Sequence, residues 1–545
     1  MAETLRGADI VIRALERQGV ARVFTLSGNH IMSLFDAALG RPIDLVHVRH
    51  EAAAVHMADA WGRLTGEPGI AMVTGGPGHA NAVGALFTAL GAESPMVLLS
   101  GHAATWELGR GGFQELDQAA MALPVTKASW MARSTLTLAK DVARAIDVSR
   151  SGRPGPVHLS LPSDLLEEAV GGDRVSWPEP PRRHGVALHA SIADAVLSAL
   201  QAAARPVILA GPHLSSRQGR SLLAELEQTT CVPAVVLESP RGATDATIGA
   251  FADIMSRADL VVLLGKAIDF TVRWLEPPVA DRCAQAIVLD PDGALVARAV
   301  REKGERLLIG AVADSMLAAQ TLIMRARLRE LRPQSWLAEA RAAIDKRPRA
   351  WERLASTTPG KLHPIEVFRA LGPVVARDPA TIIICDGGEF AQWGQCLLKA
   401  PRRLINSVTG AIGAGLPFAL AARVHDAQAP IFAVMGDGTF GFHMAEIETA
   451  VRRNLPFIAI VGNDACWNAE SQLQRRHYGE NRMHGCELLP ARYDALAIAL
   501  GGHGELVEAA DQLDSAIARA IASGKPAVIN IITESIAAPV LKREA

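Results

Sequence analysis

The stretch IFAVMGDGTFGFHMAEIETAVRRNLPFIAIVGND, residues 431–464, holds two apolar runs that each end in small or polar residues. The runs IFAVM and FIAIV have the length of buried strands, and the segment between them is long enough for a helix. A strand–helix–strand crossover brings parallel strands together with their carboxyl ends at one edge of a sheet. The stretch therefore predicts that Asp437 and Asp464 lie side by side.

These strand ends have the composition of a metal and phosphate site. The small and polar residues that follow the two runs are Gly436, Asp437, Gly438, Thr439, Asn463 and Asp464. Paired carboxylates suit Mg²⁺ or Ca²⁺, and Mg²⁺ in such places usually holds phosphates. The glycines let the backbone approach a diphosphate, which the next helix favours with its amino end. A lone Gly-Asp-Gly is more often a simple turn, but the Asn-Asp pair after the next strand strengthens the functional interpretation.

The rest of the chain repeats the alternation of strand and helix. Short apolar runs separated by amphipathic segments predict an α/β fold with parallel sheets covered on both faces. A Pro-rich, charged segment, SWPEPPRRHG at 176–185, is typical of a linker. We expect three doubly wound domains, at residues 1–175, 186–330 and 360–545.

Composition excludes several classes of protein. The 545 residues carry a formal net charge of −2 and only 4% aromatic residues, so no basic or stacking surface for nucleic acid is expected. The six cysteines include no C-x-x-C pair, and the start MAETLRGADI lacks a signal-peptide pattern. No apolar run is long enough to span a membrane. We expect a cytoplasmic enzyme without nucleic-acid or membrane partners.

The Gly-Asp-Gly and Asn-Asp pattern resembles the signature of thiamine diphosphate (ThDP) enzymes of the acetolactate synthase and pyruvate decarboxylase type. The resemblance covers nearly the whole chain and implies pyrimidine-binding, central Rossmann-like and diphosphate-binding domains. It also implies Mg²⁺ ligation by Asp437, by the Asp464 side chain and by the Cys466 carbonyl. The family usually has Asn where Asp464 stands, so this chain adds a negative charge near the diphosphate.

RHEAAAVHMADAWGR, residues 49–63, resembles the segment of the family that carries the catalytic glutamate. The resemblance implies that Glu51 hydrogen-bonds the aminopyrimidine ring and starts the proton relay that forms the ylide. Taken alone, Glu51 is an ordinary helix-start glutamate favoured by the helix dipole. Beside the metal motif, the catalytic interpretation is favoured.

Three further segments resemble parts of the family's cofactor pocket. GGPG implies a floor under the cofactor, GGFQELDQ a glutamine that faces the thiazolium, and SVTGAIGAG the site of the pyrimidine and an apolar wedge that bends the cofactor. The residues carried over are Gly76, Pro77, Gly78, Gln114, Gly410 and Ile412. In this family the cofactor lies between the N-terminal domain of one subunit and the C-terminal domain of another. At least a homodimer is implied, and homotetramers are common.

The local likeness is nearest to benzaldehyde lyase and the 2-hydroxyacyl-CoA lyases. NDACWNAESQLQRRHYGENRMHG, from residue 463, places Trp467 beside the cofactor, and His30 matches an active-site histidine of benzaldehyde lyase. Acetolactate synthases have a small apolar residue at the place of His30 and a tryptophan at that of Leu473. His79 follows the Gly-Pro-Gly loop and joins His30 as a candidate to move protons.

We therefore expect a ThDP-dependent lyase or carboligase. It would act on 2-hydroxy ketones or 2-hydroxyacyl-CoA through ylide and enamine intermediates. The alternatives are an acetolactate synthase-like decarboxylating carboligase of 2-oxo acids and a non-catalytic subunit. Retention of the motif residues argues against the last: Glu51, Gly410, Ile412 and Asp437.

The central domain leaves FAD or coenzyme A open as a further ligand. It has no G-x-G-x-x-G after a strand. Arg241, Lys266 and Arg273 follow its expected strands and could meet phosphates. Ordinary solvated surface is the favoured alternative for these three residues.

Overall fold

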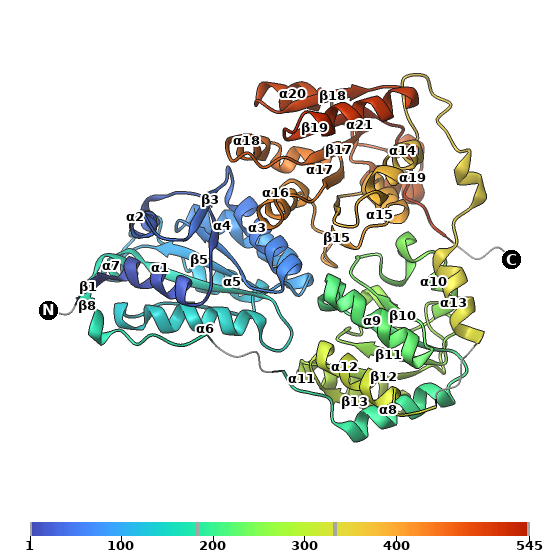
Figure 1. Ribbon diagram of the computed structural model, residues 1–545, viewed down its shortest axis with the longest axis horizontal. Helices are drawn as coiled ribbons and strands as arrows, with labels where there is room; N and C mark the ends of the chain where they lie inside the picture. The colour runs from blue at the N-terminus through green and yellow to red at the C-terminus, as the bar shows by residue number, and fades with distance from the viewer. Residues whose placement is uncertain (1–2, 181–184, 331–334, 542–545) are drawn as a thin grey trace. The chain divides into compact units, whose positions relative to one another are not determined.

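The computed structural model describes residues 3–180, 185–330 and 335–541. It divides into two compact units, with the boundary between residues 184 and 185 (Figure 1). Four residues of the predicted linker, 181–184, lie outside the described part. Within the described residues, no helix has the length and apolar character needed to cross a membrane.

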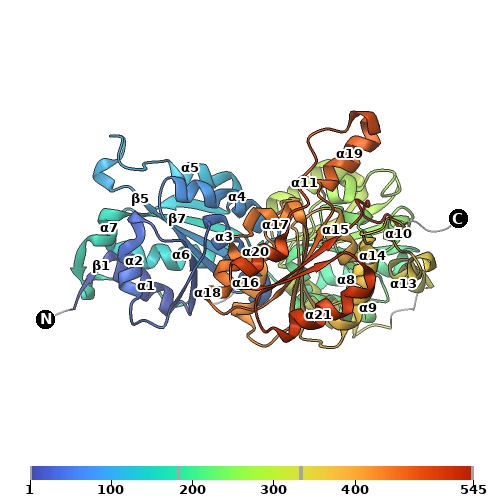
Figure 2. The same ribbon diagram turned by 90° about the horizontal axis from the view of Figure 1, so that it is seen from above.

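The first unit contains a six-stranded parallel sheet in the order β3-β2-β4-β5-β7-β6. Its strands are β2 (Arg22–Thr25), β3 (Asp44–His47), β4 (Gly69–Val73), β5 (Met96–His102), β6 (Ala128–Met131) and β7 (Pro156–Pro162). Its helices are α1 (Gly7–Arg17), α2 (Met32–Ala38), α3 (Glu51–Thr65), α4 (Pro77–Gly91), α5 (Gln118–Ala122), α6 (Leu138–Arg150) and α7 (Ser163–Glu167). A separate antiparallel pair joins β1 (Thr4–Arg6) to β8 (Ala169–Gly171). Figure 2 shows α4 and α5 on one side of β5 and β7, and α1, α2 and α6 on the other.

The second unit begins with a five-stranded parallel sheet in the order β10-β9-β11-β12-β13. Its strands are β9 (Pro206–Ala210), β10 (Ala234–Val236), β11 (Leu260–Leu264), β12 (Gln285–Asp290) and β13 (Leu307–Val312). Apolar side chains of α8 (Ala190–Ala202), α9 (Arg217–Thr230) and α12 (Ser315–Ala326) form one core cluster with the sheet. Side chains of α10 (Phe251–Met255), α11 (Gly293–Lys303) and α13 (Ser335–Asp345) form another.

The same unit ends with a six-stranded parallel sheet in the order β15-β14-β16-β17-β19-β18. Its strands are β14 (Ile382–Asp386), β15 (Arg402–Ile405), β16 (Ile431–Gly436), β17 (Ile458–Asn463), β18 (His503–Val507) and β19 (Ala527–Ile532). Helices α14 (Pro364–Ala376), α15 (Glu389–Leu397) and α21 (Leu513–Ala522) share its main apolar core. The remaining helices are α16 (Gly415–His425), α17 (Asp437–His443), α18 (Glu446–Arg452), α19 (Asn468–Tyr478) and α20 (Tyr493–Ala499).

The predicted fold class is confirmed, because three parallel sheets alternate with helices along the chain. Continuous apolar runs form the central strands, which are buried along their whole length, as in β4 and β11. The boundaries proposed for the three domains stay a prediction. His30 lies in a 3₁₀ turn (Asn29–Ile31) that is followed by α2.

Candidate functional site

The carboxyl ends of β16 and β17 lie side by side, as the crossover predicted. The two strands pair in parallel with Gly436 opposite Gly462. Asp437 is the first residue of α17, and Asp464 comes directly after β17. Both line a cavity of about 70 Å³, together with the other residues expected there: Ile412, Gly436, Gly438, Thr439, Cys466 and Trp467.

The two carboxyl groups in this cavity fit a divalent cation. Oδ2 of Asp437 is buried and has no hydrogen-bond partner among the described residues. Burial raises the pKa of Asp437 to about 6, although backbone N–H groups such as that of Gly438 oppose the shift. Burial, with the nearby Asp437 carboxylate, raises the pKa of Asp464 to about 7. Among the described residues, neither carboxyl group is paired with a cationic side chain, so these two desolvated groups favour a bound positive charge.

Side chains alone do not complete a metal site. Within the part of the chain that the structure describes, no three His, Cys, Asp or Glu side chains are placed to hold one ion. A cation at Asp437 and Asp464 would therefore need backbone and ligand oxygens as well, as expected for Mg²⁺ bound with a phosphate. The Cys466 carbonyl is the backbone oxygen expected from the sequence.

The loop after β17 is held from both sides. The N–H of Trp467 donates to the Cys486 carbonyl at 2.7 Å, and that of Leu488 donates to the Ala465 carbonyl at 2.7 Å. Asn463 is buried and donates to the Ala491 carbonyl at 2.9 Å. Asn463 therefore anchors the loop, whereas Asp464 lines the cavity.

The loop expected to hold the pyrimidine is fixed by a residue that the sequence reasoning missed. Asp386, at the end of β14, is buried and accepts from the N–H groups of Gly413 at 3.0 Å and Gly415 at 2.6 Å. Its second oxygen accepts from Nδ2 of Asn406 at 3.1 Å. Gly410 lies in this loop with φ of 71°, which suits glycine. An Asp at a strand end, the same signal as Asp437, could have pointed to Asp386.

In the first unit, Glu51 lies next to the Gly-Pro-Gly loop. It is the first residue of α3 and accepts from Nδ2 of Asn81, on α4, at 3.1 Å. A methyl group added at Gly78 would come within 3.3 Å of Oε1 of Glu51. The structure thus brings Glu51 and Gly78 together as expected. Asn81 was not anticipated from the sequence.

Gly76 is enclosed by two glutamines. Its φ is 58°, and a methyl group there would lie 2.6 Å from Cβ of Gln114. Its N–H donates to Oε1 of Gln118 at 2.8 Å, and the Gln118 amide donates to the Gly101 carbonyl and to Oγ of Ser160, both at 3.0 Å. Gln114 was expected to face the thiazolium, which stays a prediction, and the buried Gln118 was missed.

His30 is buried against the start of the same loop. Its Nδ1 is 3.1 Å from Oγ1 of Thr74, and its ring stacks with that of Phe113 at a centroid distance of 6.0 Å. A methyl group at Gly101 would lie 2.6 Å from Cβ of His30, so glycine is required there. Burial lowers the pKa of His30. His30 therefore carries a neutral imidazole near pH 7.

The other candidate histidine faces the interior. His79 is fully buried, its Nδ1 lies 2.9 Å from Oγ of Ser100, and its ring is 4.5 Å from that of His158. Burial lowers its pKa to about 4. Its catalytic role stays a prediction, and this position favours packing over contact with a substrate.

Of the three cations expected at the surface of the central domain, Arg273 is exposed and Lys266 is buried. Lys266 is only 2% exposed and donates to Asp269 at 2.5 Å. Nη2 of Arg241 lies 3.5 Å from Oε1 of Glu389. The interpretation of Lys266 as a solvated side chain was wrong, because its ammonium group is buried beside a carboxylate.

Comparisons with known proteins agree with this geometry. The family model for the thiamine pyrophosphate enzyme N-terminal TPP binding domain matches residues 5–121, and that for the C-terminal TPP binding domain matches residues 386–531. These ranges contain Glu51 with its glycine loop and Asp437 with Asp464. Taken with a full-length relative at 30% identity, the matches show that the chain belongs to the thiamine pyrophosphate enzymes.

Similar proteins of this family have different names. A probable acetolactate synthase of Mycobacterium bovis is 30% identical, with 99% of this chain and 98% of that protein covered. A 2-hydroxyacyl-CoA lyase 2 of Danio rerio is 30% identical over 96% of this chain and 91% of that protein. A 2-hydroxyacyl-CoA lyase of Arabidopsis thaliana is 28% identical over 98% of this chain and 96% of that protein. Both activities considered from the sequence are thus represented among similar proteins.

Proposed function

We propose that this thiamine pyrophosphate enzyme is a Mg²⁺-dependent carbon–carbon lyase and carboligase acting on 2-hydroxy ketones or 2-hydroxyacyl-CoA. The observation that carries the proposal is the position of His30, buried and bonded to Thr74 at the edge of the Gly-Pro-Gly loop. A lyase must remove the hydroxyl proton of a 2-hydroxy substrate, and a neutral imidazole is a suitable acceptor near pH 7.

The chain has separate groups for holding the two ends of the cofactor. Asp437, Asp464 and the Cys466 carbonyl would hold Mg²⁺ and, through it, the diphosphate. The bound cofactor supplies a carbon nucleophile for carbonyl groups and an electron sink for bond cleavage. Glu51 holds and transfers a proton at its carboxyl oxygens, and Asn81 orients it by donating to Oε2.

His30 and Gln114 are proposed to act on the substrate. The hydrogen bond between Nδ1 of His30 and Oγ1 of Thr74, together with a bond to the Phe113 backbone, fixes the imidazole ring that is proposed to accept the hydroxyl proton. Gln114 packs against Gly76 and contributes a neutral amide that can orient an oxygen atom of the substrate. Neither group adds a charge, which suits uncharged carbonyl substrates.

The second candidate is a decarboxylating carboligase of 2-oxo acids. The similarity to the Mycobacterium bovis protein, named a probable acetolactate synthase, favours it. His30 and Leu473 count against it, because acetolactate synthases have a small apolar residue at the first position and a tryptophan at the second. The name of the Danio rerio relative supports the lyase.

One experiment distinguishes the two candidates. The protein, loaded with ThDP and Mg²⁺, is incubated with pyruvate, benzoin and a 2-hydroxyacyl-CoA, and the products are identified by mass spectrometry. We expect two molecules of benzaldehyde from benzoin, or an aldehyde and formyl-CoA from the 2-hydroxyacyl-CoA, with no CO₂ from pyruvate. A matched Glu51→Gln protein should form no product. Release of CO₂ from pyruvate without cleavage of the other two substrates would refute the lyase.

Assembly and location remain part of the proposal. We propose at least a homodimer, and a homotetramer as the working form, because the family places its cofactor between subunits. Light scattering on the eluted protein tests this. A cytoplasmic location is proposed from the unpaired cysteines, all six of which are free thiols in the structure.

A further inference from the structure

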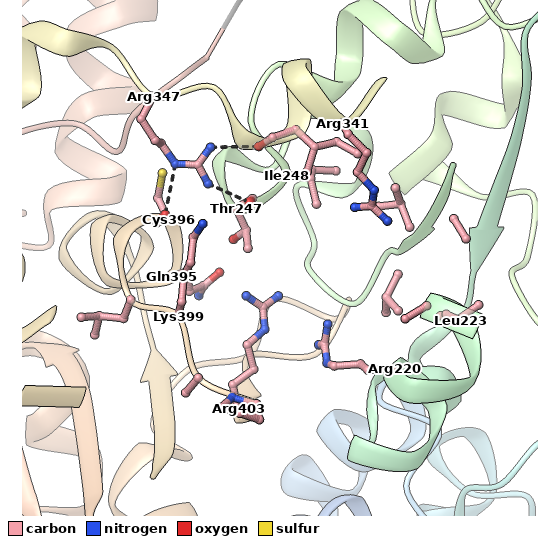
Figure 3. Close-up of a pocket in the computed structure, with 18 residues that line it drawn as sticks. Arg220, Leu223, Thr247, Ile248, Arg341, Arg347, Gln395, Cys396, Lys399 and Arg403 are labelled. Atoms are coloured by element: carbon pink, nitrogen blue, oxygen red, sulfur yellow. Dashed lines mark hydrogen bonds between the residues drawn. The ribbon is translucent and has the colours of Figure 1, made fainter. Parts of the chain in front are cut away.

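A second cavity, of about 510 Å³, lies between the central and C-terminal sheets of the second unit (Figure 3). Helix α9 and edge strand β10 line it on the central side. Helix α15 and the segment leading into β15 line it on the other side, and α13 contributes as well. The cavity shares no lining residue with the smaller one at Asp437 and Asp464. It is therefore a separate site from that proposed for the cofactor.

The lining of this cavity is strongly cationic. Among the residues that the structure describes, no acidic side chain lines it, whereas five basic ones do: Arg220, Arg341, Arg347, Lys399 and Arg403. Three carboxylates next to the cavity offset part of this charge, and one of them, Asp245, acts on Arg403 and accepts from the N–H of Thr247. Glu238 pairs with Arg220 and Arg403, and Glu227 pairs with Arg341. The five cations still exceed the three carboxylates, so the cavity keeps an excess of positive charge.

Arg220 and Arg403 form the centre of the charge. Arg403 donates to Oε1 of Glu238 through Nε at 3.0 Å and Nη2 at 2.6 Å, and Arg220 donates to the same oxygen. Figure 3 shows the two side chains next to each other and directed into the cavity. Burial and the charge on Arg403 lower the pKa of Arg220, although Glu238 opposes the shift. A bound anion would relieve this repulsion between like charges.

On the opposite side of the cavity, a guanidinium group is fixed in place by backbone carbonyls of the described residues. Arg347 donates to the carbonyls of Ile344 and Thr247 at 3.0 Å and of Cys396 at 3.3 Å. These bonds connect three parts of the chain: α13, α15 and the segment that follows β10. Its charge is held in position at the cavity, and Lys399 adds an exposed ammonium group.

Apolar side chains supply the rest of the lining. Leu223 of α9, Val235 of β10, Ile248 and Ile344 form a surface against which a flat ring can pack. The volume falls within the range of roughly 300–1,000 Å³ typical of small-molecule pockets and is far larger than an inorganic phosphate needs. Guanidinium groups bind phosphate oxygens in a bidentate manner.

We propose that this cavity binds a nucleoside di- or triphosphate as an effector. The phosphates would contact the cationic lining at Arg220, Arg341, Arg403 and Lys399, and the base would pack on the apolar lining. Such a ligand would contact elements of both sheets, so its binding would stabilise their packing against each other.

The test measures binding of ADP to protein saturated with ThDP and Mg²⁺, by isothermal titration calorimetry. We expect one saturable site per chain and a rise in Tm on adding ADP. Lys399→Gln and Arg341→Gln should each weaken ADP binding about 10-fold, which corresponds to ~1.4 kcal/mol. The control is Arg327→Gln, which removes an exposed arginine paired with Glu225 outside the cavity and should leave ADP binding unchanged.

Three outcomes would overturn the proposal. The first is the absence of saturable ADP binding, and the second is equal affinity in wild-type, Lys399→Gln and Arg341→Gln proteins. The third is displacement of ADP by coenzyme A, which would place ADP in a substrate site. If inorganic pyrophosphate binds as tightly as ADP, the nucleoside part of the proposal is wrong. None of these measurements needs turnover, so their failure is distinct from failure of the proposed lyase activity.

Discussion

The indole ring of Trp467 occupies the space beside Gly438, with its nearest ring carbon only 2.6 Å from where a β-carbon on Gly438 would lie. Gly438 belongs to the start of α17, and Trp467 follows β17, so this contact joins the two strand ends that carry Asp437 and Asp464. The glycine is needed for this packing, and the packing sets the shape of the proposed diphosphate site.

Gly438→Ala should weaken ThDP binding and lower the free energy of unfolding by about 1–3 kcal/mol, the usual cost of overpacking. The matched control is Gly441→Ala in the same helix, because a methyl group there meets nothing within 4 Å. Calorimetry with ThDP and chemical denaturation measure the two effects. Equal behaviour of the two variants would show that the contact with Trp467 does not matter.

Asp437→Asn should abolish the rise in Tm that Mg²⁺ and ThDP together produce in the wild-type protein. The reason is that Asp437 offers a buried oxygen without a partner, which an ion would satisfy. The loss of metal affinity should exceed the roughly 10–100-fold typical of outer-sphere changes. Glu448→Gln, which removes a surface carboxylate paired with Arg452, serves as the control. A full Mg²⁺ response in Asp437→Asn would refute metal binding by this residue.

The sequence was enough to place Asp437 beside Asp464, because a crossover between two apolar runs forces neighbouring strands together. For Glu51 and the glycine loop the prediction came from the resemblance to the family, because β2 separates β3 and β4, the strands that precede them, within the sheet. The partners that fix these groups were not predictable. Gln118 lies 42 residues from Gly76, and its own segment reads as an ordinary helix start.

The cationic cavity shows the same limit. Its arginines come from α9, α13 and the start of β15, each of which reads as a charged surface position in sequence. Only the packing of two sheets brings Arg220 and Arg403 to one carboxylate. Periodicity predicts which elements form, whereas polar contacts between distant elements depend on three-dimensional packing.

Gln118→Ala should lower the free energy of unfolding by about 2–4 kcal/mol, because it leaves the Gly76 N–H, the Gly101 carbonyl and the Ser160 hydroxyl without their partner. Gln114→Ala, on the same loop, should instead lower kcat with a much smaller effect on stability. Urea denaturation and steady-state kinetics separate the two. If Gln118→Ala is as stable as wild type, the hydrogen bonds to the loop are not important for the fold.

His30→Ala should slow substrate cleavage about 10²–10⁴-fold, the range for loss of a general base, while ThDP stays bound. The variant removes the ring that stacks on Phe113 but none of the proposed metal ligands. Single-turnover cleavage and ThDP titration measure the two properties. Unchanged cleavage would mean that His30 only starts the turn, and loss of ThDP binding would mean that its role is structural.

Acid should destabilise the first unit through its buried histidines. Burial lowers the pKa of His79 to about 4 and that of His158 well below its ordinary value, so both are neutral in the folded protein. The unfolded chain takes up these protons near pH 6.5, so stability is present above that pH and is lost as the pH falls toward 4. For His79 alone the loss is on the order of 3 kcal/mol at most.

His79→Asn should therefore show a shallower fall in unfolding free energy between pH 6.5 and 4 than wild type, measured by urea denaturation at each pH. The exposed His484 provides the control, since His484→Asn should keep the wild-type slope. An unchanged slope in His79→Asn would show that this histidine is already protonated, or not buried, in the folded protein.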